Sequence, residues 1–530
     1  MRITNPTIFN TSVNNMFRNA RHVNDIIVSI ETGKRIQRPS DDPILSNRAL
    51  RFRNFLAENN QFMTNADTAM SWMEVSEASF HNILTGRDSI MARINEQLVF
   101  GATGSNDTPD VAAIIAELRE LFAQLTTVEM NQTYMGRYVF SGFHTDQPPV
   151  LTSNMTGRTF VMEQNFSFRD IEQTVAFHRP NPFEPHILPD VNLLKLPFNN
   201  VNLTSPHGVD GVPPLGIFGP DGTPLAVNIV TIPSSTFFPS DPPVVGEPDY
   251  PAYMPPETTP PTIHFIADTG ELVIPDNALS FFEDGVVVRF SNATFGVDDD
   301  DNVYTSSVND FRAGELNPMI NFRSWELNPN WVSVNPPPPN PPDNVAFRAF
   351  NSVTQDLRVE VSSNSHITLN SHARNIVTPQ LYADFKRLFE FIDTLQPTNP
   401  WAIRTHLEQT TDLTGDALQN YVDEFLSEES RAFATMIYSR FNSMLKLHEG
   451  HITQAQREHT NLGTRMTRLD MIHVRLEENE IQYTALLSEN EDTDIPTAIM
   501  RRNSAESAFR DALRAIAMVS QLSLADFIGR

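Results

Sequence analysis

Apolar residues recur in a seven-residue pattern over long stretches at both ends of the chain. Every seventh residue from Ala49 onward is Ala49, Leu56, Met63, Met70, Glu77, Leu84, Met91 and Leu98, and all of these but Glu77 are apolar. A second set, which includes Phe52, Ala66, Met73 and Phe80, lies three residues further on in each repeat. A pattern that lasts for about seven heptads is typical of helices that pack along one another as a coiled coil.

Signals for the start and end of a helix flank this stretch. The segment Ser40-Asp41-Asp42-Pro43 precedes it, and Gly101 and Gly104 follow it. Small polar residues cap the first free N–H groups of a helix, and proline fits its first turn. The sequence therefore predicts a helix over 43–100, about 87 Å long at roughly 1.5 Å per residue, which needs other long helices to pack against.

Further stretches carry the same apolar seam. They span residues 13–30, 111–135 and 462–486, and an amphipathic stretch follows at 499–519, after a break at 490–496. All are predicted to be helical. An ordinary bundle of shorter helices shares this pattern, and it remains the alternative to a long stalk.

The middle of the chain has a different pattern. Thirty-four of the 39 prolines lie between residues 148 and 400, where they exclude long helices. Short alternating apolar runs predict strands, and the first of them contains a hairpin turn at Asp268-Thr269-Gly270. The predicted strands lie at 262–275, 285–295 and 356–369, the proline-rich linkers at 241–261 and 335–342, and a resumed helix at 379–395.

These patterns predict a mainly α fold with a β-rich insert. The terminal helices would lie in 1–42 and 491–530, the helical stalk in 43–147 and 376–490, and the β-rich, proline-rich insertion in 148–375. Because both chain ends contribute to the stalk, the chain must fold back on itself.

Charge and composition exclude several functions. The chain of 530 residues has 65 acidic and 38 basic side chains, for a formal net charge of −27. This acidity disfavours a nucleic-acid coat and adsorption to anionic lipid. The absence of cysteine excludes disulfides, thiolate metal sites and cysteine nucleophiles. We find no apolar run of membrane-spanning length and no cleavable signal peptide at the start.

Candidate chemical sites are few. The cluster His448-Glu449-Gly450-His451 resembles a zinc motif, but its histidines are three rather than four residues apart, so we interpret them as solvated helical residues. The run Asp298–Asp301 could hold calcium but lacks the spacing of a calcium-binding loop, so a solvated acidic loop is the simpler interpretation. We therefore expect no enzyme, no cofactor and no metal.

Long motifs in both helical regions carry a resemblance to a known family. They are MRIT (1–4), TGKRIQRPSDDPILSNRAL (32–50), ILTGRDSIMARINEQLVFGATG (83–104), GRYVFSGFHTDQPPV (136–150), the segment 461–500 and LSLADFIGR (522–530). Together they resemble the flagellin-like family of bacterial flagellar axial proteins. The start, the fourth motif and the ending are most similar to the family's junction members, which join the hook to the filament, although Ala525 replaces a leucine.

The resemblance implies a structural subunit that is exported through the flagellar type III channel and is not an enzyme. Residues 1–40 and 495–530 would pair as an inner layer, with 43–140 and 400–490 outside it. The implied partners are further copies in a ring, hook-associated protein 1 on the hook side, flagellin on the filament side and an export chaperone. No nucleic acid and no membrane insertion are expected. The flagellum itself could be external or periplasmic.

The residues expected to matter are packing residues along the apolar seams, some of whose partners would be other subunits. They are Val13, Met16, Val23, Ile27, Leu56, Met63, Met70, Leu84, Leu469, Leu476, Leu486, Phe509, Ile516, Val519 and Phe527. Seam position alone does not separate an intramolecular core from a subunit contact.

Two alternatives remain open from the sequence. The chain could be a filament flagellin with an unusual start. The insert could instead be a binding module carried on a flagellar stalk, although only Trp325 and Trp331 could supply a tryptophan platform there.

Overall fold

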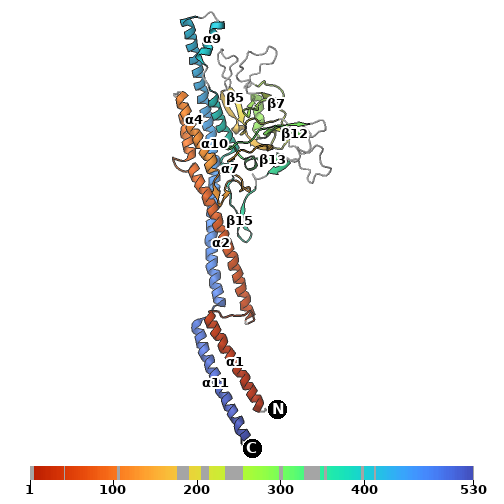
Figure 1. The fold of residues 1–530 in the computed structure, drawn as a ribbon, viewed down its shortest axis with the longest axis vertical. Helices are drawn as coiled ribbons and strands as arrows, with labels where there is room; N and C mark the ends of the chain where they lie inside the picture. Colours follow the sequence, from red (N-terminus) through yellow and green to blue (C-terminus); the bar gives the residue numbers. More distant parts are fainter. Residues whose placement is uncertain are drawn as a thin grey trace. The chain divides into compact units, whose positions relative to one another are not determined.

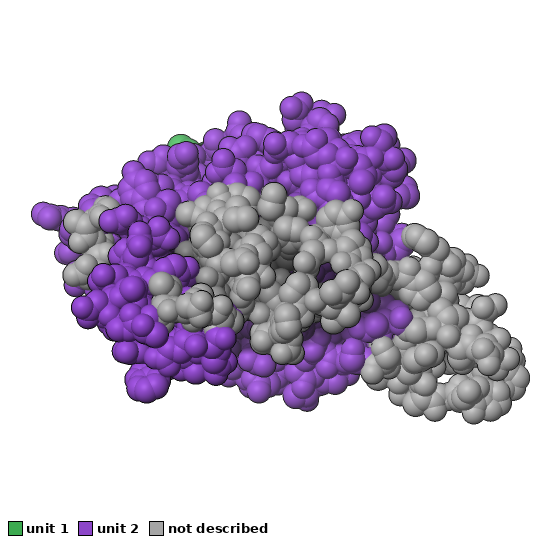
Figure 2. Space-filling model, turned by 90° about the horizontal axis from the view of Figure 1, so that it is seen from above, with its two compact units in different colours: residues 1–68, 359–367, 468–530 green, residues 69–358, 368–467 purple. Residues whose placement is uncertain are grey.

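The structure is a computed structural model (Figure 1), and the chain divides into two compact units. It describes residues 5–40, 42–103, 108–175, 190–203, 214–232, 255–297, 303–327, 347–350, 355–395, 399–410 and 414–528. Unit 1 comprises residues 1–68, 359–367 and 468–530, and unit 2 comprises 69–358 and 368–467; Figure 2 colours the two units separately. The predicted mainly α fold with a β-rich middle region is confirmed. The domain boundaries drawn from the sequence remain a prediction.

Unit 1 contains the two terminal helices, which pack along one another. Helix α1 (Asn5–Thr32) ends at Gly33, whose φ of 70° suits the left-handed position after a helix. Helix α11 (Ile495–Ile528) runs back beside α1, so that the two chain ends lie at the same end of the pair (Figure 1). The predicted pairing of the terminal stretches is therefore present within one chain.

The predicted long helix after residue 43 is interrupted. Helix α2 (Pro43–Leu84) starts where the cap signal predicts, because the Asp42 side chain accepts hydrogen bonds from the N–H groups of Ile44 and Leu45, each at 3.0 Å. The prediction of one helix over 43–100 is wrong: α2 stops, and α3 (Ile90–Gly101) begins after a turn. Gly86 in that turn has a φ of 94°, which a right-handed helix does not allow.

The other described helices are α4 (Thr108–Ala123), which continues into the π-helix η1 (Gln124–Glu129), then α7 (Ala373–Ile376), α8 (Pro379–Thr394), α9 (Pro400–Thr410) and α10 (Asp416–Glu491), with the short α5 (Pro318–Asn321). The helix predicted over 111–135 ends at Glu129, and β1 follows at Thr133–Tyr134. The helix predicted at 379–395 is confirmed. Helix α10, with 76 residues, begins long before the seam at 462–486 shows it.

The β-rich part of unit 2 contains two five-stranded sheets beside the helices (Figure 1). One has the order β14 (Phe347–Phe350), β13 (Arg323–Leu327), β3 (Phe160–Phe166), β10 (Val286–Ser291) and β6 (Gly216–Phe218). The other has the order β4 (Glu172–Val175), β5 (Asp190–Lys195), β9 (Glu271–Ile274), β8 (Thr262–Ile266) and β7 (Asn228–Ile232). Only the β7–β8 pairing among these strands is parallel.

Short hairpins and turns complete the fold. Two-stranded pairings join β1 (Thr133–Tyr134) to β2 (Arg137–Tyr138), β11 (Ala293–Val297) to β12 (Val303–Val308) and β15 (Arg358–Ser362) to β16 (Ser365–Thr368), and two 3-10 turns are η2 (Phe168–Asp170) and η4 (Asp276–Phe282). The predicted strands at 262–275, 285–295 and 356–369 are confirmed, including the hairpin turn, in which Gly270 has a φ of 71°. Most of the proline-rich linker at 241–261 and all of that at 335–342 lie outside the described residues.

Candidate functional site

The terminal pair α1–α11 holds the predicted inner-layer residues. Val13, Met16 and Val23 on α1 are half-buried, and Ile27 is 36% exposed. On α11, Phe509 and Ile516 are half-buried, and the side chains of Val519 and Phe527 lie outside the described part of the chain. Partial burial within one chain leaves apolar surface on both helices, as expected if other subunits complete the packing.

The predicted stalk residues lie along α2 and α10. Leu469 and Leu476 are fully or almost fully buried, whereas Leu56, Met63, Met70, Leu84 and Leu486 are half-buried. In unit 1 the two helices are joined by a hydrogen bond from Asn59 Nδ2 to the Leu476 carbonyl oxygen at 2.8 Å. They are also joined by the rings of Phe55 and Tyr483, whose centroids lie 5.6 Å apart. Their role in contacts between subunits remains a prediction.

Most of the exposed apolar side chains on unit 1 were missed from the sequence. Apart from Ile499, which belongs to the predicted amphipathic stretch at 499–519, they lie off the seams, so heptad counting does not mark them, yet each is large and accessible. They are Phe17, Ile44, Leu50, Phe55, Met471, Val474, Ile481, Ile495, Ile499, Met500, Leu513 and Met518. More than half of the exposed large apolar side chains in the described residues belong to unit 1, about a quarter of the chain. Exposed apolar side chains of this size are candidates for protein–protein contact.

A buried carboxylate ties the terminal pair to the start of the stalk within unit 1. Glu491 is 4% exposed and forms ion pairs with Lys34 Nζ, at 2.7 Å, and with Arg53. Burial works to raise the pKa of Glu491, but the hydrogen bonds from Lys34 and Arg53 hold it below its ordinary value. The main chain adds hydrogen bonds of 2.8 Å from Arg35 N to the Glu491 carbonyl and from Thr493 N to the Gly33 carbonyl.

A buried ionic network fixes the second sheet to the helices in unit 2. Arg387 on α8 pairs with Glu172 on β4 and with Glu271 on β9, the latter at 3.2 Å. Arg440 on α10 lies 3.3 Å from Glu172. Burial works against ionisation of Glu271, but the charges of Arg387 and then Lys195 hold its pKa below the ordinary value. Breaking such a buried pair leaves an uncompensated charge, so the network favours this packing of the second sheet against α8 and α10.

Lys195 on β5 extends this network. Its ammonium group is fully buried and donates to Glu390 Oε2 at 2.8 Å, to Asn199 Oδ1 at 3.0 Å and to the Thr269 carbonyl. Burial lowers the pKa of Lys195, while the Glu390 carboxylate opposes that shift. Sequence patterning missed this residue because a lysine on a short strand is ordinarily solvated.

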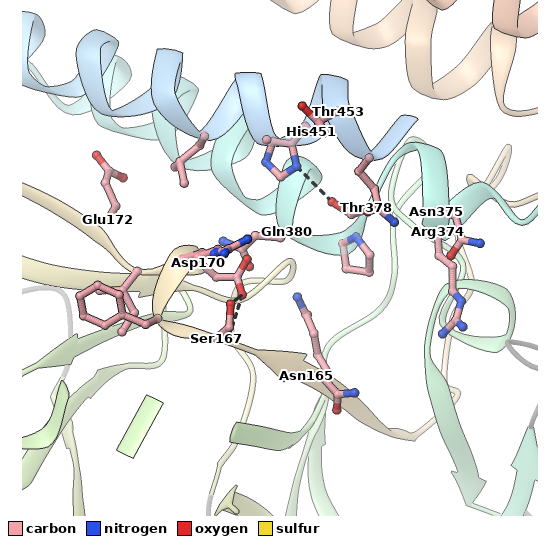
Figure 3. Close-up of a pocket in the computed structure, with 18 of the residues that line it drawn as sticks. Asn165, Ser167, Asp170, Glu172, Arg374, Asn375, Thr378, Gln380, His451 and Thr453 are labelled. Carbon is pink, nitrogen blue, oxygen red and sulfur yellow. Dashed lines mark hydrogen bonds between the residues drawn. The ribbon is translucent and has the colours of Figure 1, made fainter. Parts of the chain in front are cut away.

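The predicted solvation of the histidine cluster is wrong. His448 is fully buried, and its Nε2 lies 3.2 Å from the Met91 carbonyl oxygen. His451 is 9% exposed; its Nε2 lies 3.0 Å from Asp384 Oδ2, and its Nδ1 lies 3.4 Å from Thr378 Oγ1 (Figure 3). The two histidines therefore serve packing and hydrogen bonding in unit 2, and they have separate partners.

Other candidate features give no site. Among the residues that the structure describes, no group of three or more potential ligands is placed to hold a metal ion. The run Asp298–Asp301 lies outside them. Within the same described part of the chain, no helix is long and apolar enough to cross a membrane.

Comparison with known proteins supports the resemblance. Residues 4–145 match the family model of the bacterial flagellin N-terminal helical region. Two curated relatives share the name flagellar hook-associated protein 3. The one from Salmonella typhimurium is 24% identical over 28% of this chain and 46% of its own length. The one from Escherichia coli is 27% identical over 23% of this chain and 37% of its own length. The chain thus spans less than half the length of these relatives. The predicted resemblance of this chain to that junction protein is confirmed over the matched stretches of 149 and 120 residues.

Solved structures show a weaker likeness. A putative flagellar hook-associated protein from Vibrio parahaemolyticus is 10% identical and covers 85% of this chain and 100% of its own, with a TM-score of 0.34. The flagellar junction protein from Legionella pneumophila is 13% identical, and the match covers 85% of this chain and 100% of the Legionella chain, with a TM-score of 0.26. We draw no conclusion from TM-scores this low.

Proposed function

We propose that the chain is a structural subunit of the bacterial flagellum that joins the hook to the filament. The observation that carries this proposal is the flagellin N-terminal region at 4–145, together with two relatives named flagellar hook-associated protein 3. The chain is not an enzyme in this proposal, and it acts by packing against other axial proteins.

The surface of unit 1 supplies a physical basis for assembly. The helices α1 and α11 bury part of their apolar faces against one another and leave Phe17, Met500 and Met518 more than half exposed. A lone amphipathic helix pair is marginal in water because its apolar face lacks partners. Neighbouring copies would cover these side chains and form the ring that joins the two structures.

The partners follow from the same proposal. Hook-associated protein 1 would contact the ring on the hook side and flagellin on the filament side, and an export chaperone would hold the apolar terminal helices before secretion. The location would be the flagellum, reached through the flagellar export channel.

The filament-subunit alternative gives a different result in a nucleation experiment. Isolated hooks that end in hook-associated protein 1 are incubated with the purified chain, washed, and supplied with flagellin monomers. We expect filaments only on hooks that received the chain. If the chain polymerises by itself into long filaments on those hooks, it is a filament subunit and the junction proposal fails.

A further inference from the structure

A cleft of about 1160 Å³ opens in unit 2 between the helices α8 and α10 and the strand β3 with its following turn (Figure 3). One face of α10 forms its upper wall, because Lys446, Gly450, Gln454 and Arg457 follow one another at spacings of three or four residues. Gly450 leaves open space at this wall, since a Cβ built there would meet no atom within 4 Å.

The cleft is lined by cations without a salt bridge. Lys446 and Arg457 are exposed, Arg374 is half-buried, and none of the three forms a salt bridge with another described residue, although the Glu458 carboxylate acts on the charge of Arg374. Two of the three carboxylates at the cleft are paired with arginines: Glu163 with Arg289 and Arg323, at 2.8 and 3.3 Å, and Glu172 with Arg387 and Arg440. Asp170 accepts hydrogen bonds from Ser167 and keeps its negative charge, so the cations still outnumber the unpaired carboxylates. A cationic cleft in a chain of net charge −27 is suited to an acidic ligand.

Buried amide oxygens at the cleft also lack donors. The Oε1 atoms of Gln164 and Gln380 are buried without a hydrogen-bond partner in the described structure, and their residues are 8% and 7% exposed. An unsatisfied buried acceptor is costly, so a ligand that supplies N–H groups would be stabilised there. An inorganic anion supplies acceptors alone, whereas an acidic peptide supplies both carboxylates and backbone N–H donors.

We propose that this cleft binds an acidic segment of a second copy of the chain, the run Asp298–Asp301. The sequence places these four consecutive aspartates between β11 and β12, and their carboxylates complement the positive charges of Lys446 and Arg457, with Arg374 beside them. The choice of a second copy rests on the proposed self-association of the subunit. Binding of an acidic polysaccharide is the competing outcome of the test.

The first test measures the binding of a fluorescent peptide of residues 295–304 to the full chain by anisotropy. We expect binding that weakens roughly tenfold in Gly450→Leu, whose side chain fills the cleft, and likewise in the double variant Lys446→Gln/Arg457→Gln. Gly463→Leu is the matched control, because Gly463 is also in α10 with open space around it but does not line the cleft. Equal binding by Gly450→Leu and Gly463→Leu, or cleft-dependent binding of polygalacturonate alone, would overturn the proposal.

The second test asks whether the segment comes from another copy. Because the chain has no cysteine, Lys446→Cys and Asp300→Cys chains can be mixed and oxidised so that a disulfide reports their contact. We expect this heterodimer to form faster than that of Asp300→Cys with Glu428→Cys, an exposed position on α10 that does not line the cleft. If sedimentation shows self-association without preferential cross-linking, the cleft proposal fails while the assembly role stands. If no self-association occurs, the ring itself is refuted.

Discussion

The buried histidine His448 predicts a defined loss of stability in acid. Its imidazole is fully buried, with its Nε2 3.2 Å from the Met91 carbonyl and its ring edge-on to Phe385. Burial lowers the pKa of His448 to about 4, while the hydrogen bond to Met91 opposes the shift. The folded chain therefore keeps this imidazole neutral where the unfolded chain protonates it.

The sign and size follow from this difference in pKa. Between pH 6.5 and about 4 the unfolded state binds more protons at His448, so the free energy of unfolding decreases as the pH falls through this range. One pKa unit corresponds to about 1.4 kcal/mol, so the loss is about 2 kcal/mol at pH 5 and about 3 kcal/mol at pH 4, relative to pH 8.

The variant His448→Gln tests this reasoning. Its amide can still donate to the Met91 carbonyl, but it does not titrate. Urea unfolding is measured from pH 8 to pH 4 for both proteins, with hydrogen exchange of the peptide around residue 448 as a local readout. We expect wild type to lose about 2 kcal/mol more than the variant between pH 8 and pH 5. If the free energies of unfolding of wild type and variant differed by the same amount at every pH from 8 to 4, the reasoning would be refuted.

Further predictions concern the ionic network around Lys195, the ion pairs of Glu491, the exposed apolar side chain of Met471 and the terminal helix at residues 10–30. Lys195→Met removes the ammonium partner of Glu390, which is 33% exposed and keeps its hydrogen bond from Asn199, so the unfolding free energy decreases by about 2 kcal/mol in urea melts; a change below about 0.5 kcal/mol, the range of ordinary surface substitutions, would contradict this. Glu491→Gln speeds hydrogen exchange at the Arg35 and Thr493 amides. Unchanged exchange would show that the ion pairs of Glu491 do not hold these two backbone segments together. Met471→Glu abolishes assembly at unchanged circular dichroism. Residues 10–30 exchange rapidly in the monomer and become protected on assembly; strong monomer protection would exclude folding on assembly.

The helical ends could be predicted from sequence because their signals are local and repeated. The Asp42 cap, the heptad seams and the left-handed Gly33 each agree with the helix boundaries. The break between α2 and α3 was missed because the apolar seam continues through it, while Gly86 alone sets the turn. The seam shows how apolar residues are spaced along the sequence, but it does not show whether one helix continues through all of them.

The contacts of the middle region could not be predicted for a different reason. Lys195, Arg387 and Glu172 are far apart in the sequence, and their burial depends on how the second sheet meets α8 and α10. The burial of His448 and His451 is likewise hidden from the sequence, because a single sequence does not show which face of a long helix another element covers. Long-range packing decides the burial of all five residues, and with it the lowered pKa values of Lys195 and His448.

Immunogold electron microscopy of intact flagella, with an antibody raised against the full chain, tests the central claim most directly. The account predicts label confined to a band between the hook and the filament. Label along the whole filament would make the chain a filament subunit, and flagella without any label would contradict the flagellar role altogether.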